Sequence, residues 1–242
     1  AYVDSGFSLF CWAAVLAVAV WQAMEKGGKG WILTAGLFAG MAMGAKYSGI
    51  AVMAVVALFI LALGRERKAA LPFLLAALAA GCWWYARDPV IAGDPLTPLG
   101  GDFFGCYLWS ADDLAGVKAE QATHGVPGGL LALWPALEKA GVPVFALALL
   151  SLLGARRGQR ALNTLRFFFA ACFLFWLYSS QVARYLAPVS APGSLLAAHF
   201  AWGLVANRFT RPLAARLPRL VSPALASAAC LAALAPLAWQ GY

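Results

Sequence analysis

Charged residues are scarce in this chain: Asp, Glu, Lys and Arg make up 12% of its 242 residues, whereas 63% are hydrophobic. A typical soluble domain carries about 25% charged residues. The composition therefore excludes an ordinary soluble protein, and a mean hydropathy of +0.76 agrees with this. We expect an all-α, polytopic integral membrane protein.

The sequence also lacks the motifs of several enzyme classes. It has no G-x-x-x-x-G-K-[ST] or G-x-G-x-x-G segment, so the common phosphate-binding loops are absent. No G-x-S-x-G nucleophile elbow is present. With two histidines in all, His124 and His199, a zinc site is not expected. His199 lies in an apolar run and is interpreted as a hydrogen-bonded core histidine, and the spacing of the five cysteines indicates neither a metal site nor a disulfide framework.

The net charge of +8 follows from membrane topology rather than from a nucleic-acid surface. Thirteen of the 18 Lys and Arg residues fall in segments predicted to be cytoplasmic, four fall outside, and Lys46 lies within an apolar run. This distribution follows the positive-inside rule, so no nucleic-acid partner is expected. Eight of the ten acidic residues fall on the outer side. That bias predicts that the chemistry takes place at the outer face.

The longest apolar stretch covers residues 31–64 and contains one ionisable residue, Lys46. Basic clusters at 25–29 and 65–68 flank it, so both of its ends are predicted to be cytoplasmic. The chain must then turn back inside the membrane, at residues 46–49. A cation deep in a membrane marks a functional site by default; in the alternative interpretation, Lys46 reaches the outer interface from the tip of the hairpin.

Glycines recur at four-residue spacing in the first arm of this hairpin, at Gly36, Gly40 and Gly44. A small-xxx-small face of this kind lets two helices approach closely. We expect it to serve packing alone.

Counting the hairpin as two passes, the chain is predicted to form about eight transmembrane or partly re-entrant helices within one transmembrane domain, residues 1–242. The chain does not begin with Met, so we expect it to be a fragment. One long outer loop, 87–141, is predicted to open with turns at Arg87, Asp88 and Pro89 and to carry an amphipathic element at 128–139. The remaining predicted passes are 6–24, 69–85, 142–154, 167–179, 193–206 and 220–239.

A set of polar residues collects on the predicted outer side. Cations at the outer boundary suit a phosphate held at headgroup level, and a carboxylate beside them can orient a hydroxyl, bind a divalent ion or act as a general base. In the alternative interpretation Arg184 is an interfacial anchor and Asp4 is a helix N-cap. Arg87 and Asp88 are then a surface ion pair. The set comprises Asp4, Lys46, Arg87, Asp88, Asp94, Arg184 and Tyr185.

Four segments of the sequence resemble one family. They are YVDSGFSLF at 2–10, GLFAGMAMGAKY at 36–47, GDPLTP at 93–98 and RYLAP at 184–188. Their order and spacing are similar to those of GT-C glycosyltransferases, the polytopic enzymes that use polyprenyl-phosphate sugars and that include protein O-mannosyltransferases and aminoarabinose transferases. Asp94 stands where that family usually has Asn.

The resemblance implies that Asp4 is the acidic catalytic residue of the second outer loop. It also implies that Lys46, Arg184 and Tyr185 lie near the lipid phosphate. The family's first-loop acidic motif is not in this sequence, so we expect it upstream of Ala1 if it exists. A divalent metal ion is an open option, with Asp4 as its one candidate ligand.

The resulting expectation is a membrane glycosyltransferase of the inverting type in a bacterial inner membrane. Its partners would be a polyprenyl-phosphate-linked sugar donor, the lipid bilayer, and an acceptor glycan, lipid or protein. One alternative is a secondary transporter with a broken-helix substrate site. Another is a non-catalytic membrane subunit.

Overall fold

The structure, a computed structural model, is built from α-helices and short 3₁₀ turns, and no strand occurs among the described residues. This confirms the predicted all-α class. The described residues are 2–97, 99–105, 107–124, 134, 137–138, 141–154, 158–179 and 182–209.

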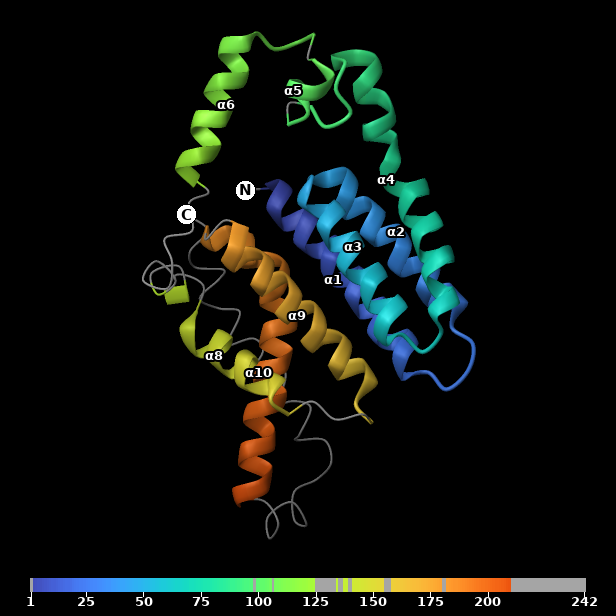
Figure 1. The fold of residues 1–242 in the computed structure, drawn as a ribbon. Helices are drawn as coiled ribbons and strands as arrows, with labels where there is room; N and C mark the ends of the chain where they lie inside the picture. Colours follow the sequence, from blue (N-terminus) through green and yellow to red (C-terminus); the bar gives the residue numbers. More distant parts are fainter. Residues whose placement is uncertain are drawn as a thin grey trace.

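The first four helices form one half of the molecule, and α2 packs between α1 and α4 (Figure 1). Both α2 and α3 are apolar, and the chain reverses direction between them. Their bounds are α1 Tyr2–Ala23, α2 Lys29–Ala45, α3 Ser48–Leu63 and α4 Ala70–Ala92, with a 3₁₀ turn, η1 Arg67–Ala69, before α4.

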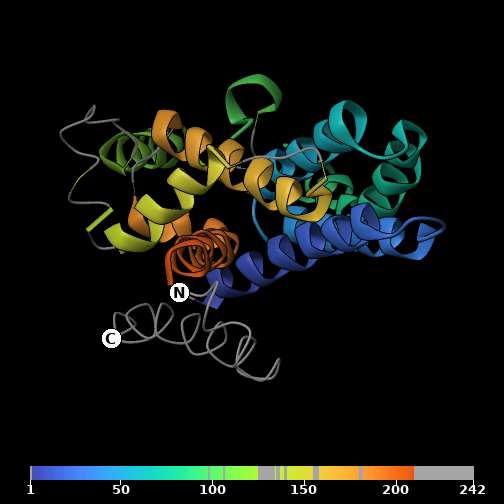
Figure 2. The same ribbon diagram turned by 90° about the horizontal axis from the view of Figure 1, so that it is seen from below.

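Three further helices form the other half, with α9 and α10 packed against α1 (Figures 1 and 2). An aromatic cluster joins α8 to α9: the Phe145 ring of α8 lies 5.9 Å from Phe169 and 6.2 Å from Phe173 of α9, measured between ring centroids. Two short helices, α5 and α6, lie above the hairpin in Figure 1 and make a cap. The bounds are α5 Gly101–Phe104, α6 Ala111–His124, α8 Val142–Leu152, α9 Arg160–Ser179, η2 Ala183–Leu186 and α10 Ala187–Phe209.

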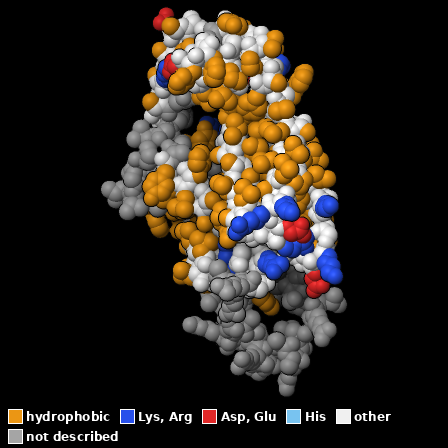
Figure 3. Space-filling view, turned by 45° about the vertical axis from the view of Figure 1, so that its right-hand side comes forward, with side chains coloured by type: hydrophobic (Ala, Val, Ile, Leu, Met, Phe, Trp, Pro, Cys, Tyr) orange, Lys and Arg blue, Asp and Glu red, His pale blue; other side chains and the backbone are white. Residues whose placement is uncertain are grey.

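Three of the described helices are long and apolar enough to cross a membrane, namely Val3–Ala23, Arg67–Ala92 and Arg160–Tyr178. Hydrophobic side chains cover the flank of the molecule between its ends, and Lys and Arg gather at one end (Figure 3). The predicted pass 220–239 lies outside the described residues, as does most of the element at 128–139.

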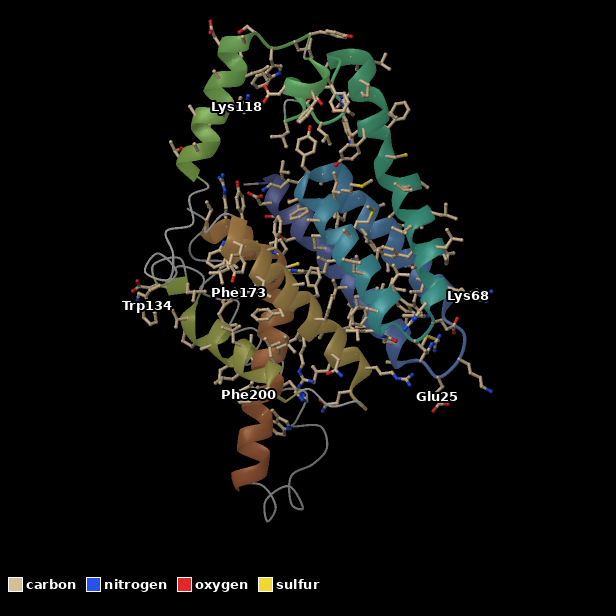
Figure 4. The ribbon with its side chains drawn as sticks, viewed as in Figure 1. Glu25, Lys68, Lys118, Trp134, Phe173 and Phe200 are labelled. Atoms are coloured by element: carbon tan, nitrogen blue, oxygen red, sulfur yellow. The ribbon has the colours of Figure 1, made fainter. Side chains whose placement is uncertain are left out.

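We name the two ends of the helices by their residues. The basic end carries Glu25 and Lys68, which lie at the same end in Figure 4. The hairpin end carries Lys46 between α2 and α3 and faces the cap. The cap residue Lys118 is labelled at the far side of the molecule from Glu25.

The glycine face of α2 packs against α4, as the sequence predicts. A side chain at Gly36 or Gly40 would collide with the backbone carbonyl oxygens of Phe73 or Ala77. The close approach therefore depends on the missing side chains at these two positions.

The sequence predicts that Arg87, Asp88 and Pro89 open a loop, and this prediction is wrong. Helix α4 continues through Pro89 to Ala92 and ends at Gly93, whose φ is 80° and whose N–H donates to the Pro89 carbonyl at 3.1 Å. A single proline removes one intrahelical hydrogen bond. The helix ends only where a glycine adopts the left-handed conformation that other residues avoid.

Two other helices also begin earlier than predicted. Helix α9 begins at Arg160 rather than at 167, and Arg166, predicted to lie in a cytoplasmic segment, is a buried residue of that helix. Helix α10 begins at Ala187 rather than at 193 and contains Pro192. In both cases a charged or proline residue that usually marks a boundary is accommodated within the helix.

Candidate functional site

The hairpin tip is set by a local break in the helix at Lys46. Lys46 has an extended backbone, with φ −159° and ψ 142°, while its N–H still donates to the Ala42 carbonyl at 3.1 Å. Gly49, in the first turn of α3, lies so close to the backbone of Ala42 and Met43 that a side chain there would collide with it. The turn therefore presents the Lys46 side chain at the hairpin end, as the charge pattern predicts.

The first turns of α1 supply the anionic side of the site. Asp4, Phe7 and Ser8 lie three and four residues apart and so share one helix face. The Asp4 carboxylate accepts a hydrogen bond from Lys46 Nζ at 2.6 Å, and the side chains of Asp4 and Lys46 are 25% and 29% exposed. Asp4 thus lies within the helix with its side chain on Lys46, rather than acting as the cap of α1.

The third part of the site is the short turn η2 before α10. Two tryptophan N–H groups hold this segment in place: Trp176 Nε1 donates to the Val182 carbonyl and Trp12 Nε1 to the Pro188 carbonyl, both at 2.9 Å. These bonds join the turn to α9 on one side and to α1 on the other. Tyr185 is thereby fixed with its ring centroid 4.4 Å from Lys46 Nζ, within the range of a cation–π contact.

The three parts line one cavity of about 350 Å³ together with α3 and α9. The structure brings four of the predicted site residues to its wall: Asp4, Lys46, Arg184 and Tyr185. They come from three segments far apart in the sequence. The remaining lining is mostly apolar and includes Val52, Val55, Cys172, Phe175 and Trp176.

The cavity is polar at the hairpin end and apolar along α3 and α9. Arg184 is exposed and lies 5.3 Å from the Tyr185 ring, and a hydrogen bond with the Tyr185 side chain raises the pKa of its guanidinium. The ion pairs found among the described residues do not include Arg184. Lys46 is neutralised by Asp4, so Arg184 leaves the cavity mouth with a net positive charge.

The other predicted site residues do not line this cavity. Arg87 lies over the Trp84 ring at 4.3 Å and pairs with Asp88 at 3.1 Å, which is the surface ion pair of the alternative interpretation. Asp94 is fully buried, and its carboxylate accepts the N–H groups of Leu96 at 2.7 Å and Gly100 at 2.9 Å. The two carboxylate oxygens of Asp94 therefore stabilise the loop 94–100, in which Asp94 itself lies.

This loop reaches the cavity through two other residues. The Tyr47 hydroxyl donates to the Thr97 carbonyl and so links the loop to the hairpin tip. Leu99 then forms part of the cavity wall. Asp94 therefore supports the site through the conformation of this loop.

Among the described residues, no group of three or more His, Cys, Asp or Glu side chains could hold a metal ion. Asp4, the one predicted candidate ligand, is bonded to Lys46. The described residues therefore do not make a metal site.

A second cavity of about 460 Å³ lies at the basic end, between the end of α1 and the start of α9. His199 lines it and its side chain is exposed. The interpretation of His199 as a core histidine is therefore wrong: an apolar run does not reveal which of its residues faces outward. The side chain of His124 lies outside the described residues.

A comparison with curated proteins finds similarity to an uncharacterized protein of Shigella flexneri. The two are 39% identical over 128 residues, which cover 52% of this chain and 68% of that protein. The chain belongs to the same family as this Shigella protein. No family model matches the chain, and no solved structure matches it.

Several cavity residues were not predicted from the sequence. Phe7 and Ser8 follow from Asp4 by helical spacing, so this signal was available. Pro188 belongs to the RYLAP segment at 184–188, on which the family resemblance rests. Leu99 and Phe175 join the site only through tertiary packing. No local pattern distinguishes them from other apolar residues of the chain.

Proposed function

We propose that the chain is the membrane part of an inverting glycosyltransferase of the GT-C type, which moves a sugar from a polyprenyl-phosphate carrier to an acceptor hydroxyl. It would act at the outer face of a bacterial inner membrane, with about eight passes in the whole domain. The observation that carries the proposal is the single cavity that joins Asp4, Lys46, Arg184 and Tyr185.

The cavity offers both kinds of surface that such a donor needs. Its polar end has two cations, and Lys and Arg are the side chains that hold phosphate groups. Its apolar length, lined by Val52, Val55 and Phe175, suits an isoprenoid chain. The polar end lies at the hairpin tip, at the opposite end from the exposed Lys and Arg cluster that includes Lys68 (Figure 4). The positive-inside rule makes that cluster cytoplasmic and the hairpin end outward.

In the proposed reaction the acceptor oxygen attacks the anomeric carbon and forms the new C–O bond. The bond between that carbon and the phosphate oxygen breaks, and the phosphate leaves with the electron pair. Lys46 and Arg184 stabilise the charge that develops on the leaving phosphate. Asp4 orients the acceptor hydroxyl and takes its proton. One displacement inverts the anomeric centre.

The experiment that tests this proposal is the substitution Lys46→Ala in the full-length protein. Removing one preorganised charge from such a site costs about 10²–10³ in rate. We expect a loss of at least about a hundredfold in polyprenyl-phosphate release, with the unfolding temperature little changed. Release is measured with a polyprenyl-phosphate sugar in proteoliposomes.

Lys118→Ala is the matched control, because Lys118 also pairs with an aspartate at 2.6 Å but lies on the exposed cap. It should retain full turnover. Wild-type turnover in Lys46→Ala would contradict the proposed role. Substrate flux without release of polyprenyl phosphate would favour the transporter instead.

A further inference from the structure

The ion pair between Asp4 and Lys46 has a consequence for the ligands of the cavity. The carboxylate of Asp4 contacts Lys46 Nζ at 2.6 Å. Any phosphate that binds Lys46 must come close to that carboxylate. Two like charges a few ångströms apart in a partly buried site repel each other strongly.

We infer that Asp4 acts as a fixed counter-charge that makes the cavity favour the singly charged donor over the spent carrier phosphate. This inference rests on the proposed function and names how the same site is regulated. A sugar-linked phosphodiester carries one negative charge. The phosphomonoester left after transfer carries about −1.5 to −2 at pH 7, because its second pKa is about 6.

Repulsion from Asp4 scales with the charge of the ligand. The carboxylate therefore raises the free energy of the bound monoester about twice as much as that of the bound diester. After transfer, Asp4 passes the proton it has taken to water and becomes negative again. The spent carrier is then expelled from a site that, with Lys46 and Arg184 alone, would hold the dianion tightly.

The surroundings of Asp4 fit this role. Both members of the pair are only about one-quarter exposed, so salt screens the interaction less than it screens a surface pair. Arg184 remains without a carboxylate partner among the described ion pairs and so supplies the attraction that both ligands share. The described lining of the cavity contains no acidic residue besides Asp4.

The test is a binding measurement on the full-length protein in nanodiscs at pH 7.5. The two probes are decaprenyl monophosphate and its methyl phosphodiester, which differ in charge but share the lipid chain. We expect Asp4→Asn to tighten binding of the monoester about tenfold and of the diester about threefold. The ratio of the two dissociation constants should therefore shift about threefold towards the monoester.

Two further variants separate charge from shape. Asp4→Glu keeps the charge and should retain the wild-type ratio. Asp102→Asn removes the carboxylate of the Lys118 pair on the exposed cap, also at 2.6 Å, and should change neither dissociation constant. Should Asp4→Asn fail to fold, Asp4→Ser removes the same charge and is measured in its place.

The possible outcomes are distinct. Equal tightening of both probes, or weaker binding of both, would overturn the inference, because the effect of Asp4 would then not depend on ligand charge. Binding of neither probe by the wild-type protein would overturn the proposed function itself. Binding of the two probes to the wild-type protein is therefore measured first, before the variants.

Discussion

Both ends of the helices hold arginine or lysine side chains largely withdrawn from solvent, but the surroundings of these side chains differ. At the basic end, Arg65 donates to the Met24 carbonyl and, at 2.6 Å, to the Gly27 carbonyl, and its side chain is 9% exposed. It also pairs with Glu66 at 3.6 Å and lies 5.2 Å from the Trp21 ring, but it is not at the wall of the cavity at the hairpin end. At the hairpin end, Lys46 contacts a carboxylate and an aromatic ring at the wall of a cavity. Arginines that satisfy backbone carbonyls hold the fold together, whereas a lysine facing an open cavity is available to a ligand.

Arg166 extends the same contrast at the basic end. It is 6% exposed, and it donates to the Ser151 carbonyl at 2.9 Å and to the side chains of Gln159 and Asn163 at 3.0 and 2.8 Å. No carboxylate is among these partners. Its guanidinium ties the start of α9 to the end of α8, so its function is structural.

The largest effect on stability is expected from Arg166→Met. Methionine fills a similar volume but replaces none of the three hydrogen bonds that the guanidinium donates, and the loss should lower the free energy of unfolding by about 3 kcal/mol. The measurement is SDS-titrated unfolding in mixed micelles. Turnover of the folded fraction should stay within about twofold of wild type. An unchanged free energy of unfolding would show that Arg166 does not stabilise the fold.

A smaller loss, about 2 kcal/mol, is expected from Arg65→Met, which removes two bonds to the loop after α1. Arg67→Met is the control, since Arg67 is exposed in η1 and such substitutions usually stay within about 0.5 kcal/mol. The same unfolding titration measures both variants. Equal free energies of unfolding for Arg65→Met and Arg67→Met would contradict the structural role of Arg65 at the basic end.

Tyr47→Phe tests the link between the hairpin and the cap and should have the smallest effect. It removes one hydroxyl bond to the Thr97 carbonyl, at a cost of about 1 kcal/mol. The loop that carries Leu99 is then held less firmly, so we expect a higher KM for the donor with kcat little changed. Tyr107→Phe is the control, because Tyr107 is 78% exposed on the same cap. Equal kinetics in the two variants would remove the positioning role of Tyr47.

The sequence predicted the parts of the fold and site that local pattern controls. Basic flanks located the hairpin turn at Lys46, and the four-residue glycine spacing predicted a close helix contact on α2, whose partner α4 the structure supplies. The grouping of Asp4, Lys46 and Arg184 followed from their predicted common side of the membrane and from a family resemblance.

Tertiary partners decided the features that the sequence did not reveal. Arg166 resembles a boundary residue in the sequence, yet three acceptors, in α8, in α9 and just before α9, allow it to be buried. Asp94 resembles a site residue, yet two N–H groups of its own loop take up its carboxylate. In each case the identity of the hydrogen-bond partner, which composition and spacing do not contain, separates structure from function.

The most direct test of the central claim compares the two ends in one binding measurement. Decaprenyl monophosphate is titrated into the full-length protein in nanodiscs, with Lys46→Met and Arg65→Met beside the wild type, at a temperature where all three are folded. We predict that Lys46→Met weakens binding at least about tenfold while Arg65→Met leaves it within about twofold. Equal affinity in the two variants would contradict the assignment of the cavity at Lys46 as the lipid-phosphate site.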